Sequence, residues 1–320
     1  MNTSQENLIN VFASLGERLR VPDMRVVSLA QQENPWYTEK NILYALDAIC
    51  DKMLCEAKLR EWISHYNIGE PRGKRVGIIM AANLPLVGFA DLLYVLFSGA
   101  IAVVKPSSRD RVLMGYVIDL LREIEPEIKI EFLDDNTALD ALIATGSDNA
   151  NRYFRQKYGD IPKLLRGTMF SFARLDNSVS DSELALLTDD VFLHNSLGCR
   201  SVSHLAVSKD FDLLKLIKIF AQREEAQSEG YINNYKQNKA IKTLMREDFL
   251  DGGFFTLTLG EPDKNLYISN ITYSFSDNFE PEKVQCEVSR EGVYFGCAQR
   301  PELSDYADKE DVMDFLIKNI

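Results

Sequence analysis

The sequence predicts an α/β protein whose first half is a parallel sheet with helices on both faces. Short, continuously apolar segments alternate there with longer segments that have helical spacing. The short segments lack the polar alternation of half-exposed strands, which is typical of parallel strands covered on both sides. The expected strands are RVGIIM (75–80), AIAVV (100–104), IKIEFL (128–133) and DALIA (140–144), and the expected helices are 84–99, 110–124 and 148–159. This order indicates a Rossmann-type sheet, in which nucleotides bind at the carboxyl ends of the strands.

The flanking regions indicate more helix and a second, smaller α/β domain. Apolar residues at Ile42, Leu46, Ile49, Met53 and Leu54 predict one long helix through about 38–65. After the polar segment RLDNSVSDSEL we expect a helix to about residue 193, a strand HLAVS, two helices, several short apolar strand candidates, among them GVYFG, and a last helix DVMDFLIKN. The predicted divisions are residues 1–172, residues 173–290, and a segment 291–320 that returns to the domain interface.

Composition excludes several classes of function. Thirty-six basic against 48 acidic residues give a net charge of -12, which argues against a nucleic-acid partner because phosphate binding needs a basic surface. The sequence predicts no signal peptide and no membrane span, so the cytoplasm is the expected location. Five cysteines without CxxC spacing and three histidines favour neither a disulfide framework nor a metal site.

Three turns that follow expected strands carry candidate binding residues. Asn83 precedes Leu-Pro and is interpreted either as the cap of the next helix or as an amide donor to an oxyanion at the strand end. Lys105 directly follows the second expected strand and is either a solvated charge or a contact to a ribose or phosphate. Gly146 and Ser147 form a weak phosphate-turn pattern, in which Ser147 either donates to a phosphate or caps a helix. GxGxxG and GxxxxGK[ST] patterns are absent from the sequence.

Cys199 is the candidate reaction centre. It follows a helix and Gly198 and precedes Arg200, a context that favours an exposed thiolate, whereas we interpret the other four cysteines as small buried residues. His194 lies five residues upstream, a spacing that one helix face brings together poorly, so a Cys-His dyad is not predicted. A thiolate without such a base suits attack on an already activated carbonyl.

The ordered set AANLPLVGF, VVKPSS, ATGS and LGCRSVS resembles the aldehyde dehydrogenase superfamily. More narrowly it is similar to the acyl-CoA reductase family typified by the fatty-acid reductase of bacterial bioluminescence, and QENPWYT (32–38) and FGCAQRPELSDYADKEDVMDFL (295–316) extend the similarity. The resemblance implies an aldehyde-dehydrogenase-like fold, with a cofactor-binding domain over 1–172 and a catalytic domain over 173–290. The sequence departs from the family at Ala82, where glycine is common, and at Ala90, where histidine is common.

The resemblance also implies roles for individual residues. Cys199 matches the nucleophile, which takes the acyl group from an acyl-CoA or acyl-carrier-protein donor, and Asn83 matches the side-chain donor to the oxyanion. Lys105 matches the contact to the adenine-side ribose, in a turn that continues with Ser107 and Ser108. Gly146 and Ser147 match the turn at the cofactor phosphates.

The same comparison bears on the cofactor and on assembly. Dehydrogenases that prefer NAD often carry glutamate at the position of Ser108, and Arg109 is adjacent, so NADPH is expected rather than NADH. No metal is expected. The resemblance is compatible with a homodimer, since relatives commonly form dimers or larger assemblies, but the sequence does not fix the oligomeric state. The expected activity is reduction of an acyl thioester to the aldehyde. The alternative is an inactive family member that serves as a binding or assembly subunit, and an ordinary aldehyde oxidiser is disfavoured because the family's water-activating glutamate has no counterpart here.

Overall fold

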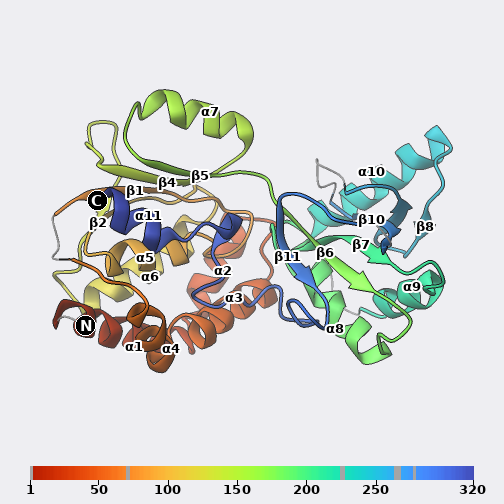
Figure 1. Ribbon diagram of the computed structural model, residues 1–320, viewed down its shortest axis with the longest axis horizontal. Coiled ribbons are helices and arrows are strands. Elements are labelled where there is room, and N and C mark those ends of the chain that lie inside the picture. The colour runs from red at the N-terminus through yellow and green to blue at the C-terminus, as the bar shows by residue number, and fades with distance from the viewer. Residues whose placement is uncertain (1–2, 70–72, 224–227, 263–267, 277–278) are drawn as a thin grey trace. The chain divides into compact units, whose positions relative to one another are not determined.

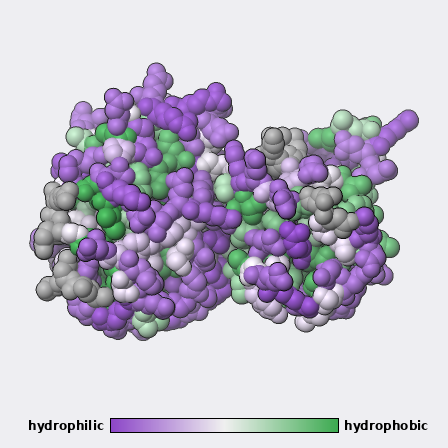
Figure 2. All heavy atoms as spheres, viewed as in Figure 1, coloured by the Kyte–Doolittle hydropathy of each residue, from purple (hydrophilic) through white to green (hydrophobic). Residues whose placement is uncertain are grey.

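The computed structural model describes residues 3–69, 73–223, 228–262, 268–276 and 279–320, and divides the chain into two compact units. Unit 1 comprises residues 1–167 and 300–320, and unit 2 comprises residues 168–299. Hydrophilic residues cover most of the visible surface of each unit in Figure 2, in keeping with a sequence that is 26% charged. None of the helices in the described ranges combines the length and apolarity that crossing a bilayer requires.

Unit 1 is built on a five-stranded, wholly parallel sheet in the order β3-β2-β1-β4-β5. Its strands are β1 (Arg75–Ile79), β2 (Ile101–Lys105), β3 (Ile130–Phe132), β4 (Ala141–Thr145) and β5 (Lys163–Arg166). Its helices are α1 (Thr3–Leu19), α2 (Met24–Glu33), α3 (Glu39–Lys52), α4 (Glu56–Ser64), α5 (Phe89–Phe97), α6 (Arg111–Ile124), α7 (Asp148–Lys157) and α11 (Val312–Asn319). The parallel sheet expected from the apolar strands is therefore confirmed.

Helices cover both faces of this sheet. Figure 1 shows α7 on one side and α5 and α6 on the other, and α11 packs against α5. The chain therefore winds one way through β1, β2 and β3 and the other way through β4 and β5, so that the winding reverses between β1 and β4. Ligands of open α/β sheets bind at such a reversal, outside the carboxyl ends of the strands.

Unit 2 contains a six-stranded mixed sheet in the order β11-β6-β7-β10-β9-β8, in which only the β8–β9 pair of the described strands is antiparallel. Its strands are β6 (Phe170–Leu175), β7 (Val202–Val207), β8 (Leu250–Asp251), β9 (Thr256–Leu259), β10 (Asn270–Phe275) and β11 (Val284–Val288). Its helices are α8 (Asp181–Phe192), α9 (Leu213–Ala221) and α10 (Glu229–Met245). The turn that carries Cys199 connects α8 to β7.

Two predicted helices are wrong in extent. The single helix over 38–65 is two helices, because Cys55 is extended (φ -69°, ψ 122°) and caps the start of α4. Met53 and Leu54 are both buried at this break, so the apolar spacing runs through it without interruption. The helix expected from residue 84 begins only at Phe89, because Leu86 adopts a left-handed backbone (φ 55°) that a helix excludes.

Three strands were not predicted, and one predicted strand is absent. β5 and β6 carry arginines, Arg166 and Arg174, which hide their strand character in the sequence, and β8 is only two residues long. GVYFG contributes a single bridge, between Val288 and Val293, rather than a strand.

The unit boundaries differ from the predicted divisions by several residues. The first lies before β6 because that strand pairs with β7 and β11. The second lies after Gln299, since the backbone N–H groups of Gly296 and Ala298 donate to Asp190 of unit 2.

Candidate active site

The predicted binding residues of unit 1 lie at one edge of its sheet. Lys105 is the last residue of β2 and is in register with Ile79 at the end of β1, while Ala144 in β4 is in register with the same residue on the other side. The turns that follow these three strands therefore emerge next to one another. The structure brings Asn83, Lys105 and the Gly146–Ser147 turn to the carboxyl edge that the strand order marks as a binding edge.

Asn83 lies in an irregular loop and not at the start of a helix. The helix that follows begins at Phe89 and is capped by Gly88, so the interpretation of Asn83 as a helix cap is wrong. Between Met80 and Ala90, all of which the structure describes, Asn83 is the only exposed residue. The loop therefore presents one polar side chain to solvent and packs the rest of its length against the unit.

Three buried side chains hold this loop. The Asn34 Nδ2 donates to the carbonyl of Ala82 at 3.2 Å, and the Tyr37 hydroxyl donates to the carbonyl of Leu84 at 2.8 Å. The Asp110 carboxylate accepts a hydrogen bond from the Leu86 N–H at 2.9 Å. Burial raises the pKa of Asp110 to about 8. Each anchor is less than 5% exposed.

The turn after β2 exposes a basic and hydroxyl-rich surface. Lys105, Ser108 and Arg109 are exposed and Ser107 is half-buried. The Ser107 carbonyl accepts from the N–H of Asp110, which fixes the turn that leads into α6. The predicted cofactor residues of this turn are therefore at least partly accessible, and position 108 carries a neutral hydroxyl.

The turn after β4 is fixed by its own helix and by β5. Ser147 caps α7, because its Oγ accepts from the Ala150 N–H at 3.3 Å, so the capping interpretation is correct. A Cβ on Gly146 would lie 2.9 Å from the Cβ of Ala150, a separation that leaves room for glycine alone. The amide of Asn151 and the N–H of Gly146 both donate to the carbonyl of Arg166.

Arg166, which was not predicted, anchors that arrangement from inside unit 1. Its guanidinium forms two hydrogen bonds with the carboxylate of Asp91 in α5, at 2.5 and 2.7 Å, and both side chains are buried. A charge-assisted bidentate pair fixes direction as well as distance. The phosphate-turn candidate is thereby tied to the helix that follows the Asn83 loop.

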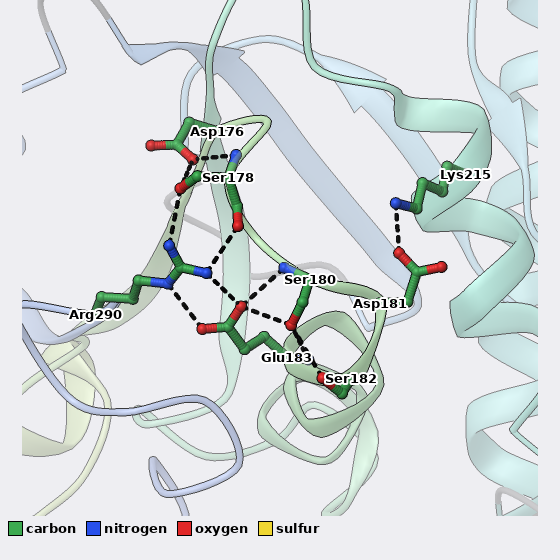
Figure 3. Close-up of polar contacts among 8 residues, drawn as sticks. All are labelled: Asp176, Ser178, Ser180, Asp181, Ser182, Glu183, Lys215 and Arg290. Atoms are coloured by element: carbon green, nitrogen blue, oxygen red, sulfur yellow. Dashed lines mark hydrogen bonds and ion pairs between the residues drawn. The ribbon is translucent and has the colours of Figure 1, made fainter.

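Cys199 lies in unit 2, after a helix whose first turn is clamped. Ser180 and Glu183 form a capping box at the start of α8, and Arg290 donates to both carboxylate oxygens of Glu183 at 2.7 and 2.8 Å. Figure 3 shows the guanidinium of Arg290 between Glu183 and Ser178, and Lys215 paired with Asp181. Hydrogen bonding to Arg290 lowers the pKa of Glu183 to about 2. The helix that leads to the cysteine is therefore fixed at its N-terminus.

A second set of contacts fixes the cysteine turn itself. The Ser171 Oγ donates to the carbonyl of Cys199 at 2.7 Å and accepts from the N–H of Cys286 at 3.2 Å. The Gln299 amide donates to the Ser201 Oγ at 3.3 Å and to the carbonyl of Asp190 at 3.2 Å. The Ser201 Oγ in turn accepts from the Gly198 N–H at 3.3 Å. The backbone around the thiol is thus held from β6 and from the end of unit 2.

The cysteines differ in exposure. Cys50 and Cys286 are buried as expected, Cys199 is half-buried, and all five cysteines are thiols. Cys55 is half-buried too, so its interpretation as a buried residue is wrong. Cys297 is exposed, so its interpretation as a buried residue is wrong: it lies in the irregular segment after Tyr294, to whose carbonyl its N–H donates. This exposed thiol is a natural control for the reactivity of Cys199.

The two histidines of unit 2 are buried and neutral. Burial and the nearby charge of Arg223 lower the pKa of His194 to about 4, which makes it a weak base. Burial likewise lowers the pKa of His204 to about 4, and its two ring nitrogens are hydrogen-bonded to Thr272 and Ser274. Within the described ranges, no group of three or more His, Cys, Asp or Glu side chains is arranged to hold a metal ion.

Solved structures similar to this chain are aldehyde dehydrogenases. The NAD+ complex of aldehyde dehydrogenase from Bacillus cereus superposes with a TM-score of 0.67 at 14% identity, over 87% of this chain and 68% of that chain. Glyceraldehyde-3-phosphate dehydrogenase from Methanocaldococcus jannaschii, complexed with NADP, gives a TM-score of 0.64 at 13% identity, over 86% and 72%. Propionaldehyde dehydrogenase from Clostridium phytofermentans gives 0.61 at 9% identity, over 86% and 73%.

The chain therefore has the aldehyde dehydrogenase fold, as its sequence motifs suggested. No protein-family model matches the sequence, and no curated protein matches it either. The narrower likeness to acyl-CoA reductases thus rests on the sequence motifs.

Sequence reasoning missed the residues that support the site. Asn34 and Tyr37 fall in QENPWYT and Gln299 falls in FGCAQR, two segments that belonged to the resemblance without an assigned role. Asp110 was visible only as the first residue of a helix. Their partners lie tens of residues away, so no local pattern could reveal the pairing.

Proposed function

We propose that this protein reduces an acyl thioester, carried by coenzyme A or by an acyl carrier protein, to the aldehyde, with NADPH as the reductant and Cys199 as the nucleophile. The observation that carries the proposal is the order of residues on the fold. A chain with the aldehyde dehydrogenase fold has a cysteine in the turn between α8 and β7, and an asparagine, a lysine and a Gly-Ser turn after neighbouring strands of its parallel sheet.

The residues at the sheet edge fit a nicotinamide dinucleotide. Lys105 and the hydroxyls of Ser107 and Ser108 would hold the adenine-side ribose, and the N-terminus of α7 behind Gly146 offers N–H groups and positive potential to a phosphate. Asp148 in the first turn of α7 is acidic and would repel a phosphate that binds close to its side chain. When bound, the nicotinamide supplies the hydride.

The choice of NADPH rests on the turn after β2. A carboxylate at position 108 would repel a 2′-phosphate, and this chain has an exposed serine there beside the exposed Arg109. Similar structures hold NAD+ in one case and NADP in another, so the fold is compatible with either cofactor.

In the proposed reaction Cys199 forms and breaks the covalent bonds, and Asn83 and a backbone N–H stabilise the charge that develops. The Cys199 sulfur attacks the thioester carbonyl, and the thiolate of the donor leaves, which forms an acyl thioester on the enzyme. The Asn83 amide and the Cys199 N–H donate to the carbonyl oxygen as it gains negative charge. After hydride has added to the carbonyl carbon, the bond from that carbon to the Cys199 sulfur breaks, which releases the aldehyde and restores the thiolate.

The test measures NADPH consumption and aldehyde formation with acyl-CoAs of increasing chain length. We expect activity in the native protein, loss of more than about 10³-fold in Cys199→Ala, and native activity in the control Cys297→Ala, because only the nucleophile forms the covalent intermediate. Full activity in Cys199→Ala would disprove the mechanism.

Two further outcomes separate the parts of the proposal. Equal or higher kcat/KM with NADH would overturn the cofactor assignment and leave the nucleophile in place. No activity with any acyl-CoA or acyl-carrier-protein donor, together with a Cys199 that alkylates no faster than Cys297, would favour a binding or assembly subunit, because such a protein has no need of a reactive thiol.

A further inference from the structure

One short segment holds the backbone on both sides of Asn83. Asn34 ends α2 and Tyr37 follows it three residues later, just before α3. The first donates to the carbonyl of Ala82 and the second to the carbonyl of Leu84, the two residues that flank Asn83. The peptide unit that precedes Asn83 and the one that follows Leu84 are therefore held by donors from the same segment.

The segment is itself rigid, so it can act as a clamp. The Tyr37 N–H donates to the carbonyl of Asn34 at 2.9 Å, and the Asn34 Oδ1 accepts from the Trp36 N–H at 3.1 Å. Thr38 next to it caps α3. Each donor is thus held between two helix ends, and its direction is set before it reaches the loop.

The loop carbonyls on this side of the unit are held by buried side chains from a distant segment. Loops usually satisfy their carbonyls with water or with their own backbone. Here two buried polar side chains, 1% and 4% exposed, are committed to the two carbonyls next to one exposed amide. A third anchor, Asp110, holds the N–H of Leu86, whose left-handed backbone needs such support.

We infer that Asn34 and Tyr37 are positioning residues that aim the Asn83 amide at the reacting carbonyl oxygen. This inference rests on the proposed function, which makes Asn83 an oxyanion donor. Such donors act only when they lie within hydrogen-bond distance of the place where charge develops, so a small rotation of the flanking peptides weakens them. The clamp fixes that rotation without touching the substrate.

The central test compares two tyrosines. Tyr37→Phe removes only the hydroxyl, which donates to Leu84 at 2.8 Å and also contacts the Ala82 carbonyl and the Asp110 side chain. Tyr94→Phe removes a buried hydroxyl of the same unit that donates to the carbonyl of Leu303, also at 2.8 Å. We expect kcat to fall about tenfold or more in Tyr37→Phe, with KM for the acyl-CoA within about twofold, and to stay within about twofold in Tyr94→Phe. Equal kcat in the two variants would overturn the inference.

A second substitution tests the other half of the clamp. Asn34→Asp keeps the oxygen that accepts from Trp36 and replaces the donor to Ala82 with an acceptor. It should lower kcat in the same way. A native kcat in Asn34→Asp would show that Asn34 is not a positioning residue. The comparison of Tyr37→Phe with Tyr94→Phe would then decide the role of Tyr37 alone.

Two measurements separate a positioning role from general weakening of the fold. In an Asn83→Ala background Tyr37→Phe should cost no further activity, because it acts through the missing amide; an independent tenfold loss there would contradict the inference while the proposed function stands. Amide hydrogen exchange in residues 80–88 should be about tenfold faster in Tyr37→Phe than in Tyr94→Phe.

The exchange measurement also keeps the two proposals distinguishable. If the native protein reduces no thioester, the proposed function fails, and exchange alone decides whether the clamp holds the loop. Faster exchange confined to 80–88 supports the clamp, and unchanged exchange overturns it.

Discussion

The Asn83 loop and the Cys199 turn are both fixed by buried polar side chains, but the two regions are held in different ways. Asn34 and Tyr37 donate directly to the carbonyls of Ala82 and Leu84, the two residues next to Asn83. In the Cys199 turn one support is direct, from Ser171, while Gln299 acts through Ser201. Each support belongs to the same unit as the residue it holds.

This difference indicates how far a perturbation should propagate. A support that bonds directly to the functional backbone passes its loss on in one step, whereas one that acts through a second side chain leaves part of the geometry in place. Asn83 should therefore respond sharply to its surroundings, and the Cys199 turn should respond more weakly. Substitutions in the two regions, taken in order of decreasing expected effect, test that contrast.

The largest effect is expected from removal of the amide itself. Asn83→Ala should lower kcat by about 10² to 10³, since loss of one preorganised donor to an oxyanion costs about that much. KM for NADPH should change little, because the amide is assigned to the carbonyl oxygen. Steady-state kinetics with a saturating acyl-CoA measures both values. A loss carried by KM with kcat intact would mean that Asn83 binds a ligand in the ground state and would break the contrast.

The second effect is on the free energy of unfolding and comes from one buried carboxyl group near each region: Asp110 near the Asn83 loop and Asp190 near the Cys199 turn. It should be on the order of a few kcal/mol, since one pKa unit corresponds to about 1.4 kcal/mol. Burial raises the pKa of Asp110 to about 8 and that of Asp190 to about 7, from 3.8. The folded state therefore binds more protons than the unfolded state above pH 4. Stability from these groups is full below about pH 4 and is lost as the pH rises to about 8 for Asp110 and about 7 for Asp190.

Replacement of each carboxylate by the neutral amide isolates that loss. The free energy of unfolding of Asp110→Asn, relative to the native protein, should rise between about pH 4 and pH 8, and that of Asp190→Asn should stop rising at about pH 7. Urea unfolding at several pH values measures both curves. Differences that do not change with pH would show that the two carboxylates keep ordinary affinities for protons in the fold.

The sequence predicted the scaffold of unit 1 better than its supports. Continuous apolar runs such as RVGIIM identify buried parallel strands, because both faces of such strands are covered. β5 escaped because it has only two apolar residues, between Lys163 and Arg166. The buried Arg166 is tolerated through its ion pair with Asp91, 75 positions away. Pairings of this kind depend on the tertiary fold, which a local pattern does not contain.

The same reason explains what was found and missed at the site. Asn83, Lys105 and Cys199 were identified because each follows an element whose end the sequence marks. The capping interpretation of Asn83 failed because Asn-Leu-Pro favours a helix start, whereas Asp110 draws the N–H of Leu86 into a left-handed turn. A long-range hydrogen bond there overrides the local preference.

The smallest effect is expected from the indirect support of the Cys199 turn. Gln299→Leu keeps much of the side-chain volume but removes the amide that donates to Ser201 and to the carbonyl of Asp190. We expect kcat to fall by no more than about tenfold, with KM unchanged, because Ser171 still holds the carbonyl of Cys199.

Gln285→Leu is the matched control for this change, because Gln285 is an equally buried glutamine of unit 2 that lies in β11. It should lower stability to a similar extent and leave kcat near the native value. A loss of kcat in Gln299→Leu as large as that in Asn83→Ala would show that the indirect support is as stringent as the direct one. Direct and indirect support would then matter equally, and the idea that an indirect support weakens the effect of its own loss would be wrong.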